Sequence, residues 1–404
     1  MSAQIHATLD EATVRELSET LNEPDWLLET RLAALDALEE LPFPDVIRTP
    51  GRTWTDLSDL DFDSLVDPTS AADDKDHIGP EGVEVFPLAE GIAEKEDLLK
   101  SHFGTVVDPQ TNYLTALSTA LFTTGTVVYV PSGVTADEVT IRTRMNSQSL
   151  FNYTLVVAED SSSVTILERQ ESGESIAGDR YYSGIVEVIA GENSYVQFGN
   201  LQDLDEHTYT YSLKEATADT YATVNWIDCN IGSKLTKSSV ETSLAGDSSE
   251  TKIVGAFYGY DEQHFDVDAR VWHENEHTTA DLVTRGVVDD RARSVYEGVQ
   301  NVGRDAWHTS SYQRENTLML SDESEADASP KLIINNHETE ASHSATVGQV
   351  SQEDLFYMVS RGLDDRTAKN MLVEGFFEPV FNEIDVEELR EDLRARIQER
   401  LASR

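Results

Sequence analysis

The spacing of apolar residues changes twice along the chain. Between residues 9 and 41, leucines recur every three or four positions, which predicts two helices separated at Pro24. From Thr126 onward, apolar and polar residues alternate and β-branched residues are frequent, as is typical of strands. After His343 the helical spacing returns. We therefore expect three regions: an N-terminal helical region with extended loops (1–120), a β core (121–345) and a C-terminal helical domain (346–404).

The two flanks are patterned less evenly than the core. Residues 42–85 are rich in Pro, Asp and Ser and lack a period, so we expect extended loop there, and residues 88–121 show weak helical spacing. In the C-terminal flank, Ser351 precedes an apolar helical face, and Gly362 stands where a glycine commonly ends a helix. A helix between these two residues is expected.

The β region carries regularly spaced turn signals. Six short pairs interrupt the strands, and the second members of successive pairs lie 26 to 33 residues apart: Glu159-Asp160, Glu192-Asn193, Ala218-Asp219, Gly246-Asp247, Asn275-Glu276 and Arg304-Asp305. A near-constant step indicates a stack of similar units. A β-sandwich is the alternative, but its turns usually recur roughly every 8–12 residues. The longer step favours a parallel β-helix with two or three short strands in each repeat.

The charge of the chain restricts its partners. It has 76 acidic and 30 basic residues, a net charge of −46, and only nine of the basic residues are lysines. Such a charge disfavours nucleic acid and anionic membranes, which are themselves polyanions. The acidic residues are spread through patterned segments with aromatic side chains, which argues against a disordered acidic tail. Adaptation to high salt explains the balance better, because salt screens the self-repulsion.

Cysteine content and hydropathy indicate which cellular location and which kinds of site to expect. Cys229 is the only cysteine, so neither an internal disulfide nor a cysteine-rich metal site can form in one chain. It lies in an alternating segment, where a buried packing role is expected. No apolar run reaches the roughly 18 residues that a membrane span needs, and the N-terminus lacks the pattern of a secretion signal. We expect a cytoplasmic protein with no membrane association.

Common enzyme motifs are missing. The sequence contains no phosphate-binding glycine loop of the Walker type, no GxGxxG after a strand and no GxSxG. His264, His273 and His277 are candidate metal ligands by residue type, but their spacing does not make a complete ligand set. Asp289-Asp290 is weak support for acid/base chemistry in a chain with 76 acidic residues. The residues therefore favour a non-catalytic protein.

Four long segments of the C-terminal half resemble the SufB/SufD family of iron–sulfur cluster scaffold proteins. They lie between Asp266 and Phe377 and read GVVDDRARSVYEGVQNV (286–302), SSYQRENTLMLSD (310–322), ASHSATVGQ (341–349) and LFYMVSRGL (355–363). Within this family the chain resembles SufD more than SufB, because it is short and lacks the cysteines on which SufB builds a cluster.

The resemblance implies a fold and an assembly. The expected fold is mainly β, a right-handed parallel β-helix flanked by α-helical N- and C-terminal domains. The expected assembly holds one SufB, one SufD and two copies of the ATPase SufC, with SufB paired through the end of the β-helix. This chain would hold no cofactor alone, and a nascent iron–sulfur cluster would form at the shared SufB interface.

The resemblance also points to particular residues. His343 matches the SufD histidine that faces the cluster site; the position two residues earlier, which is a cysteine in some relatives, is Ala341 here. Imidazole is a suitable iron ligand or proton carrier at such a site. SufC would dock on the C-terminal helices, where the candidate residues are Leu355, Phe356, Tyr357, Arg361, Gly362, Leu363 and Phe376.

Two other functions stay open from the residues. One is a β-helix binding or scaffold protein that pairs with itself, as a homodimer, without iron chemistry. The other is a β-helix enzyme acting on polysaccharide, which would need an exposed carboxylate-lined groove and a secretion signal. The SufD-like scaffold is preferred because the family resemblance covers more than a quarter of the chain.

Overall fold

The structure is a computed structural model that describes residues 9–44, 46–49, 52–56, 65–66, 75–173 and 178–403. The chain begins with the two helices expected from the leucine spacing, α1 (Glu11–Thr20) and α2 (Asp25–Glu40). Asp10 caps α1 by accepting a hydrogen bond from the Thr13 backbone N–H at 2.8 Å, and Pro24 stands at the start of α2. None of the helices in the described part of the chain is long and apolar enough to cross a membrane.

The segment between these helices and the core contains strands that the sequence did not predict. We expected extended loop over residues 42–85, but the described part of that segment includes four strands: β1 (Val46–Thr49), β2 (Arg52–Asp56), β3 (Lys75–Ile78) and β4 (Glu84–Pro87). Each has four or five residues, too few to display a period. They are followed by three short helices, α4 (Leu88–Glu94), α5 (Glu96–His102) and α6 (Tyr113–Leu121).

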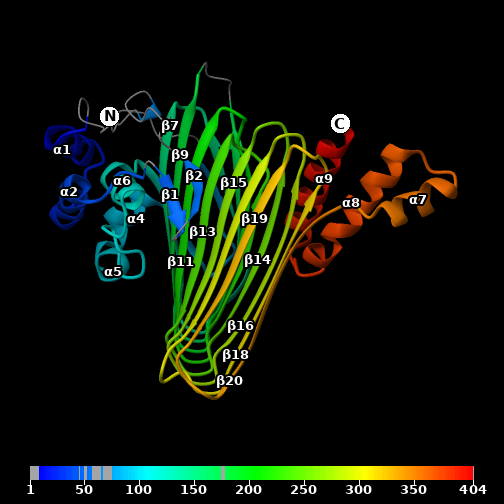
Figure 1. Ribbon diagram of the computed structural model, residues 1–404. Helices are drawn as coiled ribbons and strands as arrows, with labels where there is room; N and C mark the ends of the chain where they lie inside the picture. The colour runs from blue at the N-terminus through cyan, green and yellow to red at the C-terminus, as the bar shows by residue number, and fades with distance from the viewer. Residues whose placement is uncertain are drawn as a thin grey trace.

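The core is a parallel β-solenoid, as the repeat predicted (Figure 1). Sixteen consecutive strands alternate between two sheets and make eight rungs of two strands each. One sheet, here sheet B, holds β6 (Thr135–Met145), β8 (Ser163–Ser172), β10 (Tyr195–Asp203), β12 (Thr223–Asn230), β14 (Glu250–Gly259), β16 (Thr279–Val288), β18 (Thr309–Met319) and β20 (Thr339–Gln349). The other, sheet C, holds β5 (Thr124–Val130), β7 (Ser149–Ala158), β9 (Arg180–Ala190), β11 (Thr208–Ala218), β13 (Leu235–Leu244), β15 (His264–His273), β17 (Arg293–Val302) and β19 (Glu325–Ile334).

The predicted turn signals all lie at one end of the strands, where the chain passes from sheet C to sheet B. Each of these turns holds one residue in the left-handed region, with φ between 57° and 59°: Ser161, Asn193, Tyr221, Ser248, His277 and His308. The first five donate their backbone N–H to a carbonyl in the corresponding turn of the next rung, at 2.7–3.0 Å. The repeat of 26 to 33 residues is therefore one rung of the solenoid.

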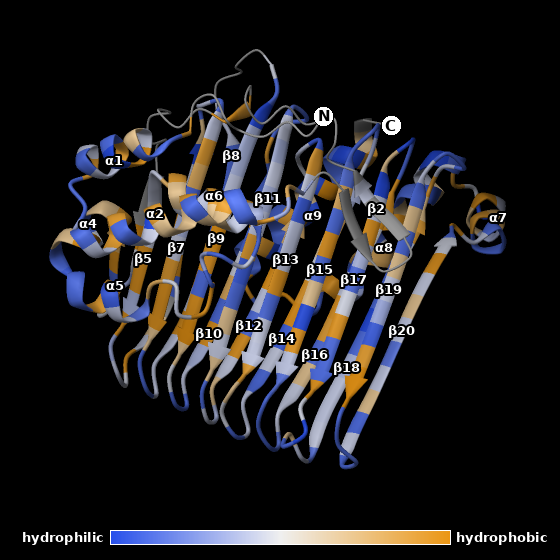
Figure 2. Cartoon of the chain, turned by 60° about the vertical axis from the view of Figure 1, so that its left-hand side comes forward, coloured by the Kyte–Doolittle hydropathy of each residue, from blue (hydrophilic) through white to orange (hydrophobic). Residues whose placement is uncertain are grey.

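Three apolar clusters hold the layers together. The first fills the space between the two sheets and includes Phe198, Trp226 and Phe257. The second lies between the outer face of sheet C and the N-terminal helices, where Leu117 and Tyr153 are buried. The third lies between the outer face of sheet B and two C-terminal helices, α8 (Asp365–Phe381) and α9 (Glu387–Ser403). Helices thus cover part of each sheet, and Figure 2 shows the N-terminal group lying over the first strands.

The two ends of the solenoid are finished differently. At the first rung, β4 pairs antiparallel with β5 and β3 pairs antiparallel with β6, so both sheets end in a strand of four residues. At the eighth rung, β19 and β20 are the last strands of their sheets in the described part of the chain. The helix that follows, α7 (Gln352–Ser360), lies away from this rung in Figure 1. We call the eighth rung the open end.

Candidate functional site

His343 lies in the middle of β20, at the open end, with its side chain exposed. Its position in the ladder shows which way it faces. The residue directly below it is Gln313 of β18, which is buried, and below Gln313 is Leu282, a member of the cluster between the sheets. Because residues paired in a parallel ladder share a face, His343 faces the interior of the solenoid. It is exposed because no further rung covers it.

The column of residues under His343 changes character near the open end. Its lower six members are all buried and apolar: Val139, Ile166, Phe198, Trp226, Ile253 and Leu282. The seventh and eighth are Gln313 and His343. In this column the apolar filling therefore stops before the solenoid does, and polar side chains occupy the last two rungs.

Gln313 is held in place from the opposite sheet. Its Nε2 donates a hydrogen bond to the Tyr296 hydroxyl at 3.3 Å, while its Oε1 finds no partner among the described residues. The side chain lies across Gly298 of β17, where an added Cβ would stand only 1.6 Å from Nε2. A larger residue at position 298 would displace the amide, so the glycine makes room for the polar layer beneath His343.

A buried carboxylate lies beside Gln313. Glu315 is fully buried; its Oε1 accepts a hydrogen bond from the Thr317 hydroxyl at 2.5 Å, and its Oε2 has no partner in the described structure. Burial raises the pKa of Glu315 from its ordinary value to about 7, while the hydrogen bond from Thr317 and the charge of Arg285 act in the opposite direction. Glu315 stands directly below Ala345, two positions along from His343.

Small side chains cover this polar layer. On β20, Ala341 and Ala345 flank His343 on the inward face, and on β19 the inward positions above Tyr296 and Gly298 are Ala328 and Pro330. The eighth rung thus forms a thin cover with one imidazole in it. An imidazole above a polar layer can bind a transition-metal ion or carry a proton. Among the described residues no group of three or more His, Cys, Asp or Glu side chains could hold a metal ion, so a metal at His343 would need ligands from outside them.

The second candidate region is the arm formed by α7 and the start of α8. α7 begins at Ser351, which caps it, and ends before Gly362, whose φ of +101° confirms the predicted glycine stop. Phe356 is 74% exposed and Tyr357 58% exposed. Such exposure of neighbouring aromatic residues is unusual unless a partner covers them.

The remaining docking candidates take other positions on the arm. Leu355 is buried and holds α7 in place, and Leu363 is half-buried. The guanidinium of Arg361 lies 5.1 Å from the centre of the Tyr357 ring. Phe376 is half-buried on α8, where its ring lies 4.8 Å from the guanidinium of Arg285 in β16. Phe376 therefore connects the arm to sheet B and is not part of the exposed aromatic surface.

Other candidates from the sequence are separated or buried. Cys229 lies under α8 and α9, fully buried as expected, and burial raises the pKa of its thiol far above the ordinary value. His264 and His273 occupy opposite ends of β15, and burial lowers the pKa of each to about 4. His277 is exposed in a turn, stacked on His308 with ring centres 4.9 Å apart. The three histidines therefore share no metal site.

Sequence reasoning did not identify Gln313 and Glu315. A signal was present, because β18 is polar at four successive inward positions: Ser311, Gln313, Glu315 and Thr317. A strand with polar residues on both faces departs from the alternation of a half-buried strand. The register between strands is needed to see that this departure lies directly below His343.

Comparisons with known proteins cover most of the chain. Residues 140–376 match the family model described as "SUF system FeS cluster assembly, SufBD core domain", and residues 65–141 match that of the "SufBD protein N-terminal region". An iron-sulfur cluster assembly SufBD family protein of Staphylococcus saprophyticus is 28% identical over 94% of this chain and 90% of its own length. A protein of the same description from Staphylococcus aureus is 27% identical over the same shares.

Proposed function

The chain belongs to the SufBD family of the SUF iron–sulfur cluster assembly system, and on that premise we propose that it is the SufD-like subunit of a complex with SufB and the ATPase SufC. In this role it is a scaffold without catalytic activity of its own. Its single cysteine, Cys229, is buried beneath α8 and α9. The chain therefore offers no accessible thiolate to a cluster, which suits a subunit that leaves cysteine ligation to SufB.

The open end is the observation that carries the proposal. Its two edge strands have ten and eleven residues, and edge strands of that length invite pairing with another chain. Ile334 and Val347 lie above residues of the seventh rung that are buried, yet they are 43% and 39% exposed. A SufB solenoid placed end to end on this rung would bury both side chains and enclose His343.

His343 then serves the nascent cluster, which is the cargo of the complex. Its imidazole would stand at the boundary between the two subunits, where it can ligate iron or receive a proton while SufB supplies the thiolates. The polar layer of Gln313 and Glu315 below it supplies hydrogen-bonding atoms that still have capacity. An apolar layer in their place would oppose a charged cluster above it.

SufC docks on the exposed face of α7 in this proposal. Phe356 and Tyr357 supply the apolar contact, and Arg361 lies beside Tyr357. The α8 helix continues from this arm onto sheet B, where Phe376 contacts Arg285. Movement of the ATPase would therefore reach sheet B through α8.

Reconstitution with SufB and SufC tests the proposal. Co-purification in high salt should give a complex of all three proteins, and Phe356→Ala with Tyr357→Ala should release SufC while SufB stays bound. His343→Ala should leave the complex intact and reduce cluster formation, followed by the absorbance of the assembled cluster. If no complex forms, the SufD-like role is wrong; if His343→Ala assembles clusters at the full rate, only the role of the histidine is wrong.

Self-pairing at the same end is the second function to test. Two copies of this chain could place their open ends together, since edge strands do not select a partner by hydrogen bonding alone. Sizing the protein alone and then with SufB separates the two functions. A homodimer that persists in the presence of SufB would favour the self-pairing scaffold.

We further infer that the protein works in concentrated salt. With a net charge of −46, the folded chain repels itself strongly in dilute buffer. At about 1 M salt the screening length falls to about 3 Å, and most of this repulsion disappears. Dialysis from molar KCl into dilute buffer should therefore lower the unfolding temperature, and an unchanged temperature would contradict the inference.

A further inference from the structure

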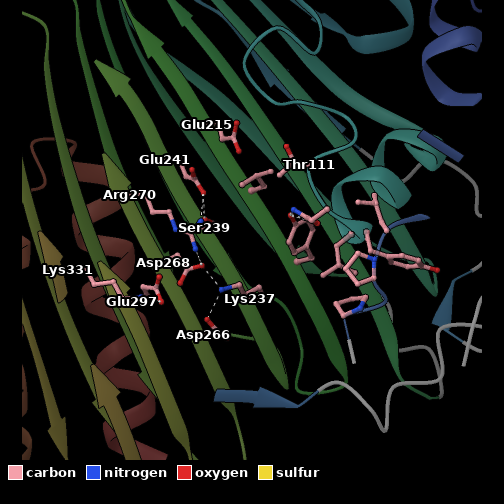
Figure 3. A pocket seen from close by; sticks show the side chains of 18 residues that line it. Thr111, Glu215, Lys237, Ser239, Glu241, Asp266, Asp268, Arg270, Glu297 and Lys331 are labelled. Carbon is pink, nitrogen blue, oxygen red and sulfur yellow. Dashed lines mark hydrogen bonds and ion pairs between the residues drawn. The ribbon is translucent and has the colours of Figure 1, made fainter. Parts of the chain in front are cut away.

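A groove lies on the outer face of sheet C and extends as far as Lys331 of β19. It encloses about 380 Å³ between the sheet and the segment that links α2 to the N-terminal strands. Leu41, Pro42 and Tyr113 form an apolar wall on the N-terminal side. Figure 3 shows the opposite wall, where charged side chains of β11, β13, β15, β17 and β19 lie in rows across the strands. We call this the sheet-C groove.

Most charges in the groove are paired with one another. Lys237 contacts Asp266 at 2.7 Å and Asp268 at 2.6 Å, and Lys331 contacts Glu297 at 3.0 Å. Each ammonium group thus has a carboxylate partner. Burial lowers the pKa of Lys237, but Asp266 and Asp268 raise it more, so the pKa lies above its ordinary value. A ligand would gain little by displacing these ion pairs, because a buried charge that loses its partner is costly.

Glu215 differs from these residues because it has no partner. It stands on β11 between two other glutamates of the same ladder row, Glu187 of β9 and Glu241 of β13. No hydrogen bond or ion pair joins Glu215 to another residue in the described part of the chain, and in Figure 3 no interaction line reaches it. Adjacent strands stand about 4.8 Å apart, so Glu215 has a carboxylate on either side.

Each flanking glutamate is satisfied by the protein itself. Glu187 accepts hydrogen bonds from the backbone N–H groups of Gly104 and Val106, at 2.9 and 2.7 Å, and from the Tyr153 hydroxyl at 2.6 Å. Glu241 pairs with Arg270 at 3.3 Å and accepts a hydrogen bond from the Ser239 hydroxyl at 3.2 Å. Among the described residues, Glu215 in the middle is the member of the row with neither a hydrogen bond nor an ion pair.

We propose that the sheet-C groove binds a small organic cation, whose ammonium or guanidinium group pairs with Glu215 and whose apolar part lies against Leu41, Pro42 and Tyr113. The volume is that of a small-molecule site, and the combination of an apolar wall with one unpaired charge is typical of such sites. Metal ions fit less well, because they would leave the apolar wall unused. This inference is independent of the proposed role in cluster assembly.

The electrostatics of the row agree with a cationic ligand. Burial, followed by the charges of Glu241 and Glu187, raises the pKa of Glu215 to about 8, while Arg270 lowers it and Asp108 raises it further. Without a ligand Glu215 is therefore largely protonated at neutral pH. A bound cation stabilises the ionised form, so binding releases a proton from Glu215 to solvent.

The experiment compares two probes of nearly equal shape, n-butylguanidinium and its neutral counterpart n-butylurea. Calorimetry with the full-length protein, at one fixed concentration of KCl, should show binding of the guanidinium and at least about tenfold weaker binding of the urea. In a parallel NMR titration with n-butylguanidinium, the ¹³C signal of the Glu215 carboxyl group should move to the position of a carboxylate. Equal affinity for the two probes, no binding of the guanidinium, or a Glu215 that stays protonated at saturation would each overturn the inference.

Two variants locate the effect. Glu215→Gln should weaken binding of n-butylguanidinium at least about tenfold and leave that of n-butylurea unchanged. Glu325→Gln removes the same charge from an exposed position on β19, outside the groove, and should change neither affinity. Retained guanidinium affinity in Glu215→Gln would contradict the assignment. The probe comparison in the unmodified protein needs no variant to fold.

Discussion

The two ends of the solenoid solve the same structural problem in opposite ways. A sheet edge exposes unpaired backbone groups, and at the first rung these groups meet antiparallel strands of only four residues, one of which ends in Pro87. At the eighth rung the edge strands are ten and eleven residues long; β19 is mostly half-buried and β20 mostly exposed. The interior follows the same division, with Val139 in the first rung and His343 in the last.

The difference between the two ends supports the proposal that a partner binds at the eighth rung. Short edge strands, one of them ending in a proline, discourage further pairing, so the first rung is finished within the chain itself. The open end keeps both long edges and half-exposed apolar side chains such as Ile334. A polar interior there costs little only if water or a partner supplies hydrogen bonds. In the proposed complex, the first rung is therefore finished within the chain and the open end meets the partner.

The largest expected effect is on stability and distinguishes the packed rungs from the open end. Trp226 and His343 belong to the same inward column, but Trp226 is 1% exposed and packs against Phe198. Trp226→Ala should lower the free energy of unfolding by about 3–5 kcal/mol, because it removes a large side chain from a packed core. Denaturant unfolding in fixed salt measures this change. A loss below about 1 kcal/mol would mean that the core between the sheets is loosely packed.

The buried Glu315 should make the stability of the solenoid depend on pH. Because the fold raises the pKa of Glu315 to about 7, the protonated side chain favours the folded state. This contribution is complete below the ordinary pKa of glutamate, is lost as the pH rises through about 7, and amounts to at most about 3 kcal/mol. Glu315→Gln should thus gain stability relative to the unmodified protein between pH 5 and pH 8.

A control for this pH dependence is present on the next strand. Glu340 is exposed on β20, so Glu340→Gln should shift stability equally at both pH values. Unfolding by urea at pH 5 and pH 8 compares the three proteins. If Glu315→Gln and Glu340→Gln behave alike, the carboxyl group of Glu315 is not buried as described.

A charge placed at each edge should distinguish the finished end from the open one. Ile334→Lys places an ammonium group where a SufB solenoid would cover it, and should weaken that complex at least about tenfold, because an unpaired charge is costly to bury. Ile78→Lys makes the same change on β3, where Ile78 is 61% exposed, and should leave the complex unchanged. Surface plasmon resonance with immobilised SufB measures the affinities of both variants. Equal weakening would place the interface elsewhere.

The smallest expected effect concerns the stability of the site residue itself. His343→Ala removes an exposed side chain that is not packed in the core, so the free energy of unfolding should change by less than about 0.5 kcal/mol. Denaturant unfolding beside Trp226→Ala makes the comparison within one column. A large loss of stability would show that the histidine packs within the chain, and would separate that effect from any loss of cluster formation.

Much of the fold could be predicted because the turns of successive rungs leave a regularly spaced signal in the sequence. The turn pairs from Glu159-Asp160 to Arg304-Asp305 mark successive passages from sheet C to sheet B, and the left-handed residue that accompanies each turn recurs with the rung. The change of period near Ser351 placed the start of α7. The strands β1 to β4 were missed because four or five residues in a segment rich in Pro and Asp display no period.

The sites were harder to predict because they depend on register. Glu315 acquires its significance from Ala345 and His343 above it, which lie about 30 residues further along the chain. The row of Glu187, Glu215 and Glu241 is likewise assembled from three strands. Family resemblance identified His343, but neither the polar layer nor the sheet-C groove corresponds to a contiguous motif.

Because the same turn recurs in each rung, the length of the solenoid can change by whole rungs. Each rung adds about 4.8 Å, so the first and eighth rungs stand about 34 Å apart. Gain or loss of one complete repeat during evolution would preserve every turn and every facing column while moving the open end by one step. Loss of half a repeat would exchange the two sheets. The number of rungs therefore fixes the distance between His343 and the closed first rung.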